Sequence, residues 1–176
     1  MRNMKREPKI EYPLTREDYR KLRNYWKPNS ASMKALFVAE APPENRRSYF
    51  FNHKTSIGQG LFSYVTCGLN IRRKTKEKRL KEFEKNFWLI DVFQEPIEDV
   101  EEKDVESHLA EFRSELNRVR PKKIVIVIPK SRLRSAWRNL VSMCLLQGYE
   151  KSQVIEIPKW IRSEFNRRLE ELRVES

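Results

Sequence analysis

The chain of 176 residues has few cysteines, few glycines and no long apolar run. Its two cysteines, Cys67 and Cys144, are far apart, so they provide neither a disulfide framework nor the four thiolates of an iron–sulfur cluster. No window of about 18 apolar residues is present, and the N-terminus lacks the apolar core of a signal peptide. We therefore expect a protein without a membrane partner, in the reducing environment of the cytoplasm.

Motifs for nucleotide cofactors and metals are also missing. Gly58 and Gly60 precede an apolar stretch, but neither the lysine-serine/threonine ending of a phosphate loop nor the dinucleotide fingerprint follows them. The two histidines have no His or Cys partner at metal-ligand spacing. We expect His53 to lie in a loop and His108 at the surface or boundary of a helix. No metal ion and no cofactor are predicted.

Positive charge is what the sequence has in excess. Its 37 Lys and Arg residues against 25 Asp and Glu residues give a formal net charge of +12. Such a surface attracts polyanions in a salt-dependent way, which makes nucleic acid the leading partner class. A solvated, heat-adapted surface also carries many charges, and 35% charged residues with few glycines fit that alternative equally well.

Four short apolar runs predict buried strands, and amphipathic segments between them predict helices. Uninterrupted apolar runs are typical of parallel strands that are covered on both faces. The sequence therefore predicts a mainly parallel α/β sandwich, a sheet flanked by helices, in a single domain over residues 34–176. The predicted strands are residues 35–39, 87–92, 122–128 and 154–157.

Residues 1–33 are expected to form a helical extension that packs on this domain. Thr15, followed by Asp18, is a predicted N-cap, and the helix then places Tyr19, Leu22 and Trp26 on one face toward the core. Its positive side chains are predicted to form a solvated face or to widen a basic surface; they are Arg20, Lys21 and Arg23. A second amphipathic helix is predicted over residues 72–85, with a basic outer face that is either solvated or in contact with a nucleic-acid backbone.

Polar and basic residues follow each predicted strand. In parallel sheets, ligands bind beyond the carboxyl ends of the strands, where these residues converge. The exit of the first strand holds Glu40, two prolines, two arginines and an aromatic cluster, a combination suited to a flat, polar, phosphate-linked ligand. Asp91 lies within the apolar second strand, near its carboxyl end, so it either accepts loop amides or recognises a ligand.

The segment AEAPPENRRSYFFN, the four-strand layout and the LID sequence of the second strand resemble the uracil-DNA glycosylase superfamily, especially its small branches. The resemblance covers about residues 34–170. It implies a four-stranded parallel sheet in the order 2-1-3-4 and an enzyme that flips an altered base out of DNA and hydrolyses its N-glycosidic bond. A monomer acting on single- or double-stranded DNA is expected.

The resemblance also implies roles for individual residues. Glu40 would activate water and, with its negative charge, stabilise the oxocarbenium-like transition state. Asp91 would occupy the place of the residue that reads the base edge, and Lys159 would supply positive charge near the departing base in place of the missing histidine. The flipped base would stack on the aromatic cluster of Tyr49, Phe50 and Phe51 beside Asn52. The nucleic-acid backbone would be held by Arg46, Arg47, Lys130, Ser131, Arg132 and, as a wedge, Trp160.

Three departures from the family pattern concern the chemistry. Ala41 occupies the position at which the most active branch has a catalytic Asp. Asp91 replaces the usual Asn, and an ionised carboxylate only accepts hydrogen bonds, so it would repel a base carbonyl unless protonated. The second family motif has Lys159 and Trp160 without a histidine.

Several alternatives therefore stay open. The aromatic residues could belong to the core, and Asn52 could cap a turn. The protein could be a glycosylase, a nucleic-acid-binding relative without catalysis, or a hydrolase of free nucleosides.

Overall fold

The computed structural model describes residues 7–9, 14–28, 33–43, 48–58, 60–127, 134–157 and 161–174. Its four strands form one sheet in the order β2-β1-β3-β4, and each neighbouring pair is parallel. The predicted α/β class and strand order are confirmed. The strands are β1 (Ala35–Ala39), β2 (Phe87–Asp91), β3 (Lys123–Val127) and β4 (Val154–Ile157).

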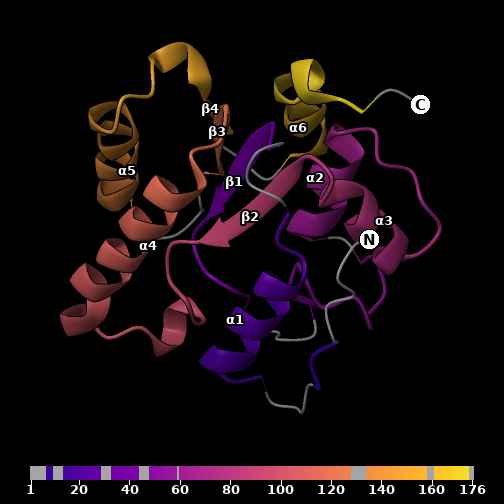
Figure 1. Cartoon of the computed structure of the whole chain (residues 1–176), viewed down its shortest axis with the longest axis horizontal. Coiled ribbons are helices and arrows are strands. Elements are labelled where there is room, and N and C mark those ends of the chain that lie inside the picture. Colours follow the sequence, from indigo (N-terminus) through magenta and orange to yellow (C-terminus); the bar gives the residue numbers. More distant parts are fainter. Residues whose placement is uncertain are drawn as a thin grey trace.

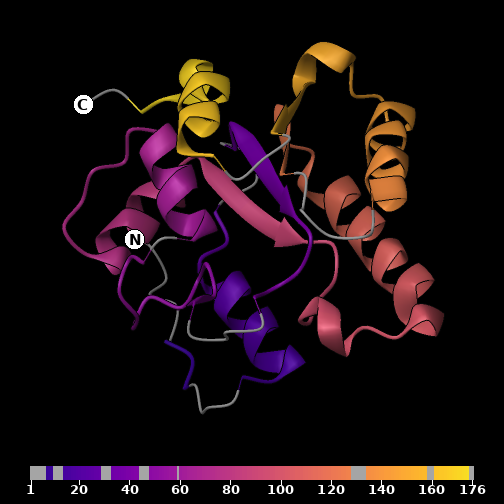
Figure 2. The same ribbon diagram turned by 180° about the vertical axis from the view of Figure 1, so that it is seen from behind.

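Helices cover both faces of the sheet. Figures 1 and 2 show α4 and α5 on one side of the sheet, α2, α3 and α6 on the other, and α1 beyond the arrowheads of β1 and β2. The helices are α1 (Arg16–Tyr25), α2 (Leu61–Gly68), α3 (Lys76–Phe83), α4 (Val105–Val119), α5 (Arg134–Leu146) and α6 (Arg162–Arg168). Short 3-10 turns are formed by Ile97–Asp99, Glu102–Asp104, Lys151–Gln153 and Glu170–Leu172.

The edge strand β2 is as buried as the central strand β1, and α1 covers its Trp88. All five residues of each strand are buried. The Trp88 indole Nε1 donates to the Arg23 carbonyl at 3.3 Å, and Lys27 Nζ lies 4.5 Å from the centroid of the Trp88 ring. This arrangement brings α1 next to the carboxyl end of β2.

The N-terminus of α1 matches the sequence prediction. Thr15 Oγ1 accepts from the Asp18 N–H at 3.3 Å, and the Asp18 carboxylate accepts from the Thr15 N–H at 3.0 Å, which completes a capping box. Tyr19, Leu22 and Trp26 belong to the buried core, as their spacing predicts.

Some predicted boundaries are wrong. The helix predicted over residues 72–85 is shorter, because Thr75 caps it with a side chain that accepts from the Lys78 N–H. The basic residues 72–74 are thus exposed ahead of the helix. The strand predicted over 87–92 ends at Asp91.

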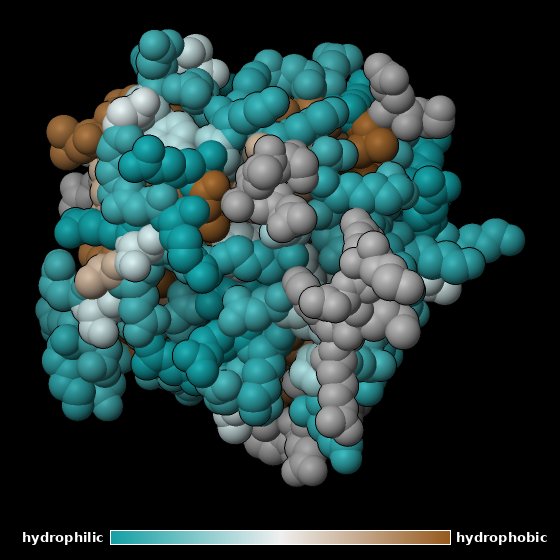
Figure 3. Space-filling view, viewed as in Figure 1, coloured by the Kyte–Doolittle hydropathy of each residue, from teal (hydrophilic) through white to brown (hydrophobic). Residues whose placement is uncertain are grey.

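The surface seen in Figure 3 is mainly hydrophilic, with small apolar areas. Among the described residues, the large hydrophobic side chains that are exposed are Leu145, Leu146 and Ile161. No helix in the described ranges is both long and apolar enough to cross a membrane.

Candidate active site at the carboxyl ends of β1 and β2

The ends of β1 and β2 bring two predicted site residues onto neighbouring strands. Ala39 is in register with Asp91, and Glu40 follows Ala39 directly. The backbone pairing continues past the strands, because the Val92 and Phe93 amides donate to the Ala39 and Glu40 carbonyls, both at 2.9 Å. Glu40 is partly buried. Two carboxyl groups therefore lie at one edge of the sheet.

The Asp91 side chain is 3% exposed. Burial raises the pKa of this carboxyl from 3.8 to about 7, while the Arg23 charge and the Tyr49 hydroxyl oppose the rise. The Tyr49 hydroxyl acts on Asp91 through a side-chain hydrogen bond, and burial, followed by the charge of this carboxyl, raises the pKa of Tyr49 well above its usual value. Asp91 Oδ2 is buried and has no hydrogen-bond partner within the described residues. Asp91 thus combines a buried position at a strand end with one oxygen that has no partner at hydrogen-bonding distance in the described residues.

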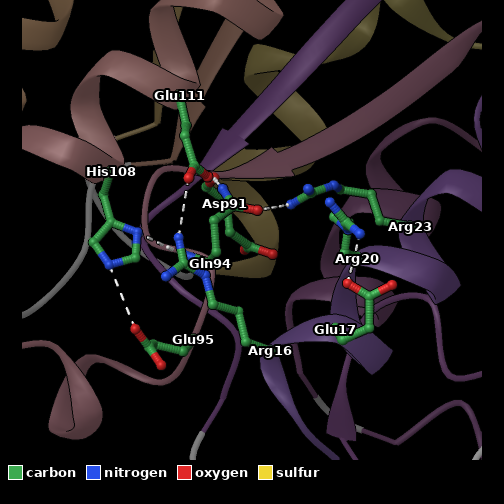
Figure 4. Close-up of polar contacts among 9 residues, drawn as sticks. All are labelled: Arg16, Glu17, Arg20, Arg23, Asp91, Gln94, Glu95, His108 and Glu111. Atoms are coloured by element: carbon green, nitrogen blue, oxygen red, sulfur yellow. Dashed lines mark hydrogen bonds and ion pairs between the residues drawn. The ribbon is translucent and has the colours of Figure 1, made fainter.

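Arg23 approaches Asp91 from α1 (Figure 4). Its prediction as part of a solvated face is wrong, since it is 8% exposed. The reason is its position: Tyr19, Leu22, Arg23 and Trp26 follow the spacing of one helix face, and that face packs on β2. The Arg23 guanidinium donates to Gln94 Oε1, and Gln94 Nε2 donates to the Asp91 carbonyl at 2.9 Å. Gln94 therefore links the arginine to the end of β2.

His108 is likewise not at the surface, and that prediction is wrong. It lies on α4 and is 1% exposed, because its ring packs edge-on against Phe93 with 5.6 Å between centroids. Its Nδ1 accepts from the Gln94 backbone N–H at 3.4 Å, and its Nε2 lies 3.5 Å from Glu95 (Figure 4). His108 thus fixes the backbone of the residue that holds Arg23.

A cleft of about 440 Å³ opens between α1 and α4. Asp91, Arg23 and Gln94 line it together with rim residues of both helices. The rim charges are paired: Glu111 with Arg16 at 3.1 Å, Glu115 with Lys27 at 2.8 Å and with Arg118 at 2.6 Å, and Arg20 with Glu17 at 2.7 Å. The cleft therefore has a polar floor and a rim whose charges largely compensate one another.

The predicted stacking residues pack inside the fold. Tyr49, Phe50 and Phe51 are all buried in the core cluster. The Phe50 ring contacts the rings of Phe51, Phe62 and Phe83 at centroid distances of 5.1, 5.0 and 5.2 Å. Asn52 is buried too, and its carbonyl accepts from the Thr55 hydroxyl at 2.9 Å in a turn. A base could stack on Phe50 or Phe51 only after this aromatic cluster rearranged.

Lys76 holds the aromatic loop and was not predicted as part of the site. It is the first residue of α3, and its Nζ donates to the Tyr49 carbonyl at 2.7 Å and to Thr55 Oγ1 at 3.3 Å. Burial lowers the pKa of this amine from 10.5 to about 8. Its signal in the sequence was the register of Lys76, Leu80 and Phe83, which places the lysine on the buried face.

The remaining predicted site residues lie outside the described residues, so their roles stay predictions. They are Arg46, Arg47, Lys130, Ser131, Arg132, Lys159 and Trp160. No group of three or more His, Cys, Asp or Glu side chains in the described ranges is arranged to hold a metal ion. Comparisons of the chain with protein-family models, curated proteins and solved structures find no match.

Proposed function

We propose that this protein binds DNA and hydrolyses the N-glycosidic bond of a damaged or deaminated base. The observation that carries the proposal is the buried Asp91 carboxyl, with its raised pKa, at the carboxyl end of β2, one strand away from Glu40. Strongly perturbed carboxyl groups cluster at functional sites, and ligands of parallel α/β proteins bind at this edge of the sheet.

Asp91 is suited to contact a nucleobase. A carboxyl with a pKa of about 7 supplies both protonation states at neutral pH. As a carboxylate it accepts a hydrogen bond from a ring N–H, and as an acid it donates one to a carbonyl. Buried polar groups that pair with a base edge discriminate strongly against a ligand that leaves them unpaired.

Glu40 is the proposed catalytic carboxylate. Cleavage of a glycosidic bond passes through an oxocarbenium-like state, so a negative charge beside the sugar and a base for the attacking water both accelerate it. Glu40 is partly exposed at the end of β1, where it is accessible to water, whereas Asp91 is buried. We thus assign Glu40 to the sugar and the attacking water, and Asp91 to the base.

The net charge of +12 would bring DNA to this edge. We assign phosphate and wedge contacts to Arg46, Arg47, Lys130, Ser131, Arg132 and Trp160, and stabilisation of the leaving base to Lys159. The protein would act as a monomer in the cytoplasm.

The experiment is a base-release assay on oligonucleotides that carry uracil, hypoxanthine, xanthine or oxidised guanine, with alkali used to cleave abasic products. We expect release of at least one base, and a loss of roughly 10²-fold or more in the Glu40→Gln variant. Glu98→Gln, an exposed change with the same loss of charge, is the control and should keep full activity. If no base is released from any of these substrates, the proposed glycosylase activity is refuted.

A second candidate, a nucleic-acid-binding protein without catalysis, is favoured by the packing of Phe50 and Phe51 against other rings. It predicts tight binding of oligonucleotides that weakens as salt rises, with no abasic product. Absence of binding even at low salt would remove both candidates.

A further inference from the structure

Exposed lysines line the edge of the sheet that is opposite to the candidate active site. At this amino edge, Lys34 precedes β1, Lys122 precedes β3, and Lys151 lies in the 3-10 turn that leads into β4. All three residues are exposed. Figures 1 and 2 show the amino ends of β1 and β2 on the side of the sheet away from α1. Because β1, β3 and β4 are successive strands of the sheet, the three lysines follow one another along its amino edge.

Hydrogen bonds fix the backbone of these strand entries. The Lys34 N–H donates to the Asn86 carbonyl at 2.7 Å, and the Lys123 N–H donates to the Lys34 carbonyl at 3.1 Å. The register of β1 with β3 then places Lys34 beside Lys122. Gln153 Nε2 donates to the Lys122 carbonyl at 3.2 Å, which joins the entry of β4 to that of β3. The lysines therefore extend from a rigid backbone whose neighbouring strands lie about 4.8 Å apart.

The charge of this row is not compensated within the described residues. None of the three lysines forms an ion pair there, whereas the neighbouring Lys123 pairs with Glu171 at 2.6 Å. Glu150 adds one acid beside Lys151 in the chain, which still leaves the lysines in excess. Like charges on paired strands destabilise a sheet, so an anion that lies across the row would relieve this repulsion.

Arg120 adds a fourth cation to the amino edge. It is the C-cap of α4 and has a left-handed backbone, with φ 41° and ψ 62°, where glycine is normally preferred. Burial raises the pKa of Tyr149 and the Arg120 charge opposes the rise, so the guanidinium lies near the segment that leads to Lys151. A cation at this cap also compensates the negative end of the α4 dipole. The inference therefore depends on the three lysines, and Arg120 extends their surface.

We propose that the amino edge is a second nucleic-acid surface, which binds backbone phosphates without reading bases, through Lys34, Lys122, Lys151 and Arg120. Phosphates follow one another about every 3.4 Å along each strand of a duplex, so a row of cations at strand spacing can contact several of them. A row fits a linear polyanion better than a lipid surface, which also requires a substantial apolar face. The inference goes beyond the proposed function, because this surface lies opposite to the candidate active site and needs no catalysis.

The test measures binding of a short undamaged duplex to the full-length protein by fluorescence anisotropy at several salt concentrations. The duplex lacks an altered base, so base recognition does not contribute. Combined Lys34→Gln, Lys122→Gln and Lys151→Gln should weaken binding roughly tenfold or more at low salt. The slope of log K against log salt should become less steep by about 2–3, as expected for three lost phosphate contacts.

Two further triple variants are the controls. Lys34→Arg, Lys122→Arg and Lys151→Arg together keep the charge and should bind like the wild type. Lys9→Gln, Lys21→Gln and Lys103→Gln together remove the same charge from exposed positions outside the amino edge, and should leave the salt slope close to that of the wild type.

Equal losses in the two glutamine variants, or an unchanged salt slope in the amino-edge variant, would overturn the inference. Lysine-dependent binding to vesicles of anionic lipid, without binding to the duplex, would overturn it in favour of a membrane surface. Base release from a damaged substrate, together with an unchanged salt slope, would refute this surface and support the proposed catalysis. Lysine-dependent duplex binding without base release would refute the catalysis and support this surface.

Discussion

The Asp91→Asn substitution gives the sharpest test of how the site is built. Asn has nearly the shape of Asp and never ionises, so the substitution removes the titration of the carboxyl without opening a cavity. Burial raises the pKa of Asp91 from 3.8 to about 7, which means that the folded protein binds this proton more tightly than the unfolded chain does.

The size of the effect follows from the two pKa values. One pH unit of difference corresponds to about 1.4 kcal/mol, so the shift from 3.8 to about 7 corresponds to about 4 kcal/mol at most. Below pH 3.8 both states are protonated, and Asp91 has no unfavourable charge. Between pH 3.8 and about 7 the unfolded chain loses the proton first, so the stability contributed by Asp91 falls as the pH rises. Above about pH 7 Asp91 is ionised in both states, and the full cost of burying its charge lowers the stability of the folded protein.

The assay is urea unfolding of the wild type and of Asp91→Asn at pH values from 4 to 8.5. The free energies of unfolding should be similar at pH 4, and the variant should become the more stable protein as the pH rises, by up to about 4 kcal/mol at pH 8. Asp99→Asn, at an exposed position, is the matched control and should show no such divergence.

A difference between wild type and Asp91→Asn that stays constant across this pH range would refute the reasoning. It would mean that Asp91 is ionised in the folded protein at every pH tested, with its charge compensated in place. The same result would remove the argument that Asp91 supplies both protonation states to a ligand.

Two further predictions concern other parts of the fold. Burial lowers the pKa of Lys76 from 10.5 to about 8, so the stability of the wild type relative to Lys76→Met should rise by up to about 3 kcal/mol between pH 8 and 10.5; unfolding curves with parallel pH dependence would contradict this. Gly68→Ala places a Cβ 2.9 Å from Leu169 Cδ1 and 3.0 Å from the Phe165 carbonyl oxygen, and should lower the free energy of unfolding by about 1–3 kcal/mol in calorimetry. Gly60→Ala, whose Cβ meets nothing within 4 Å, is its control, and an equal effect of both changes would rule out close packing of α2 on α6 as the cause.

Much of the architecture was predictable from local patterns. Uninterrupted apolar runs such as Leu36, Phe37 and Val38 can be satisfied only by burial on both faces, which requires a sheet covered by helices. The Thr15 cap was predictable as well, because both of its hydrogen bonds join residues three positions apart.

The site was predictable only in part. Glu40 and Asp91 were predicted to share one edge because the carboxyl ends of parallel strands meet there, and the register of Ala39 with Asp91 brings them together. The burial of Arg23 and His108 was not predicted, because polar side chains on amphipathic helices are normally solvated. Their positions depend on which faces of α1 and α4 contact β2 and its exit, and that choice is made by packing over long sequence separations.

The sequence by itself determined the sheet, its helices and the abundance of positive charge, because these depend on the period of apolar residues and on composition. Only the tertiary structure decided the chemistry at the end of β2. There, desolvation by surrounding elements moves the pKa of Asp91 to about 7 and leaves Arg23 Nε and Asp91 Oδ2 without partners in the described residues. Desolvation is a property of everything packed around a group, so residues distant in the sequence set it.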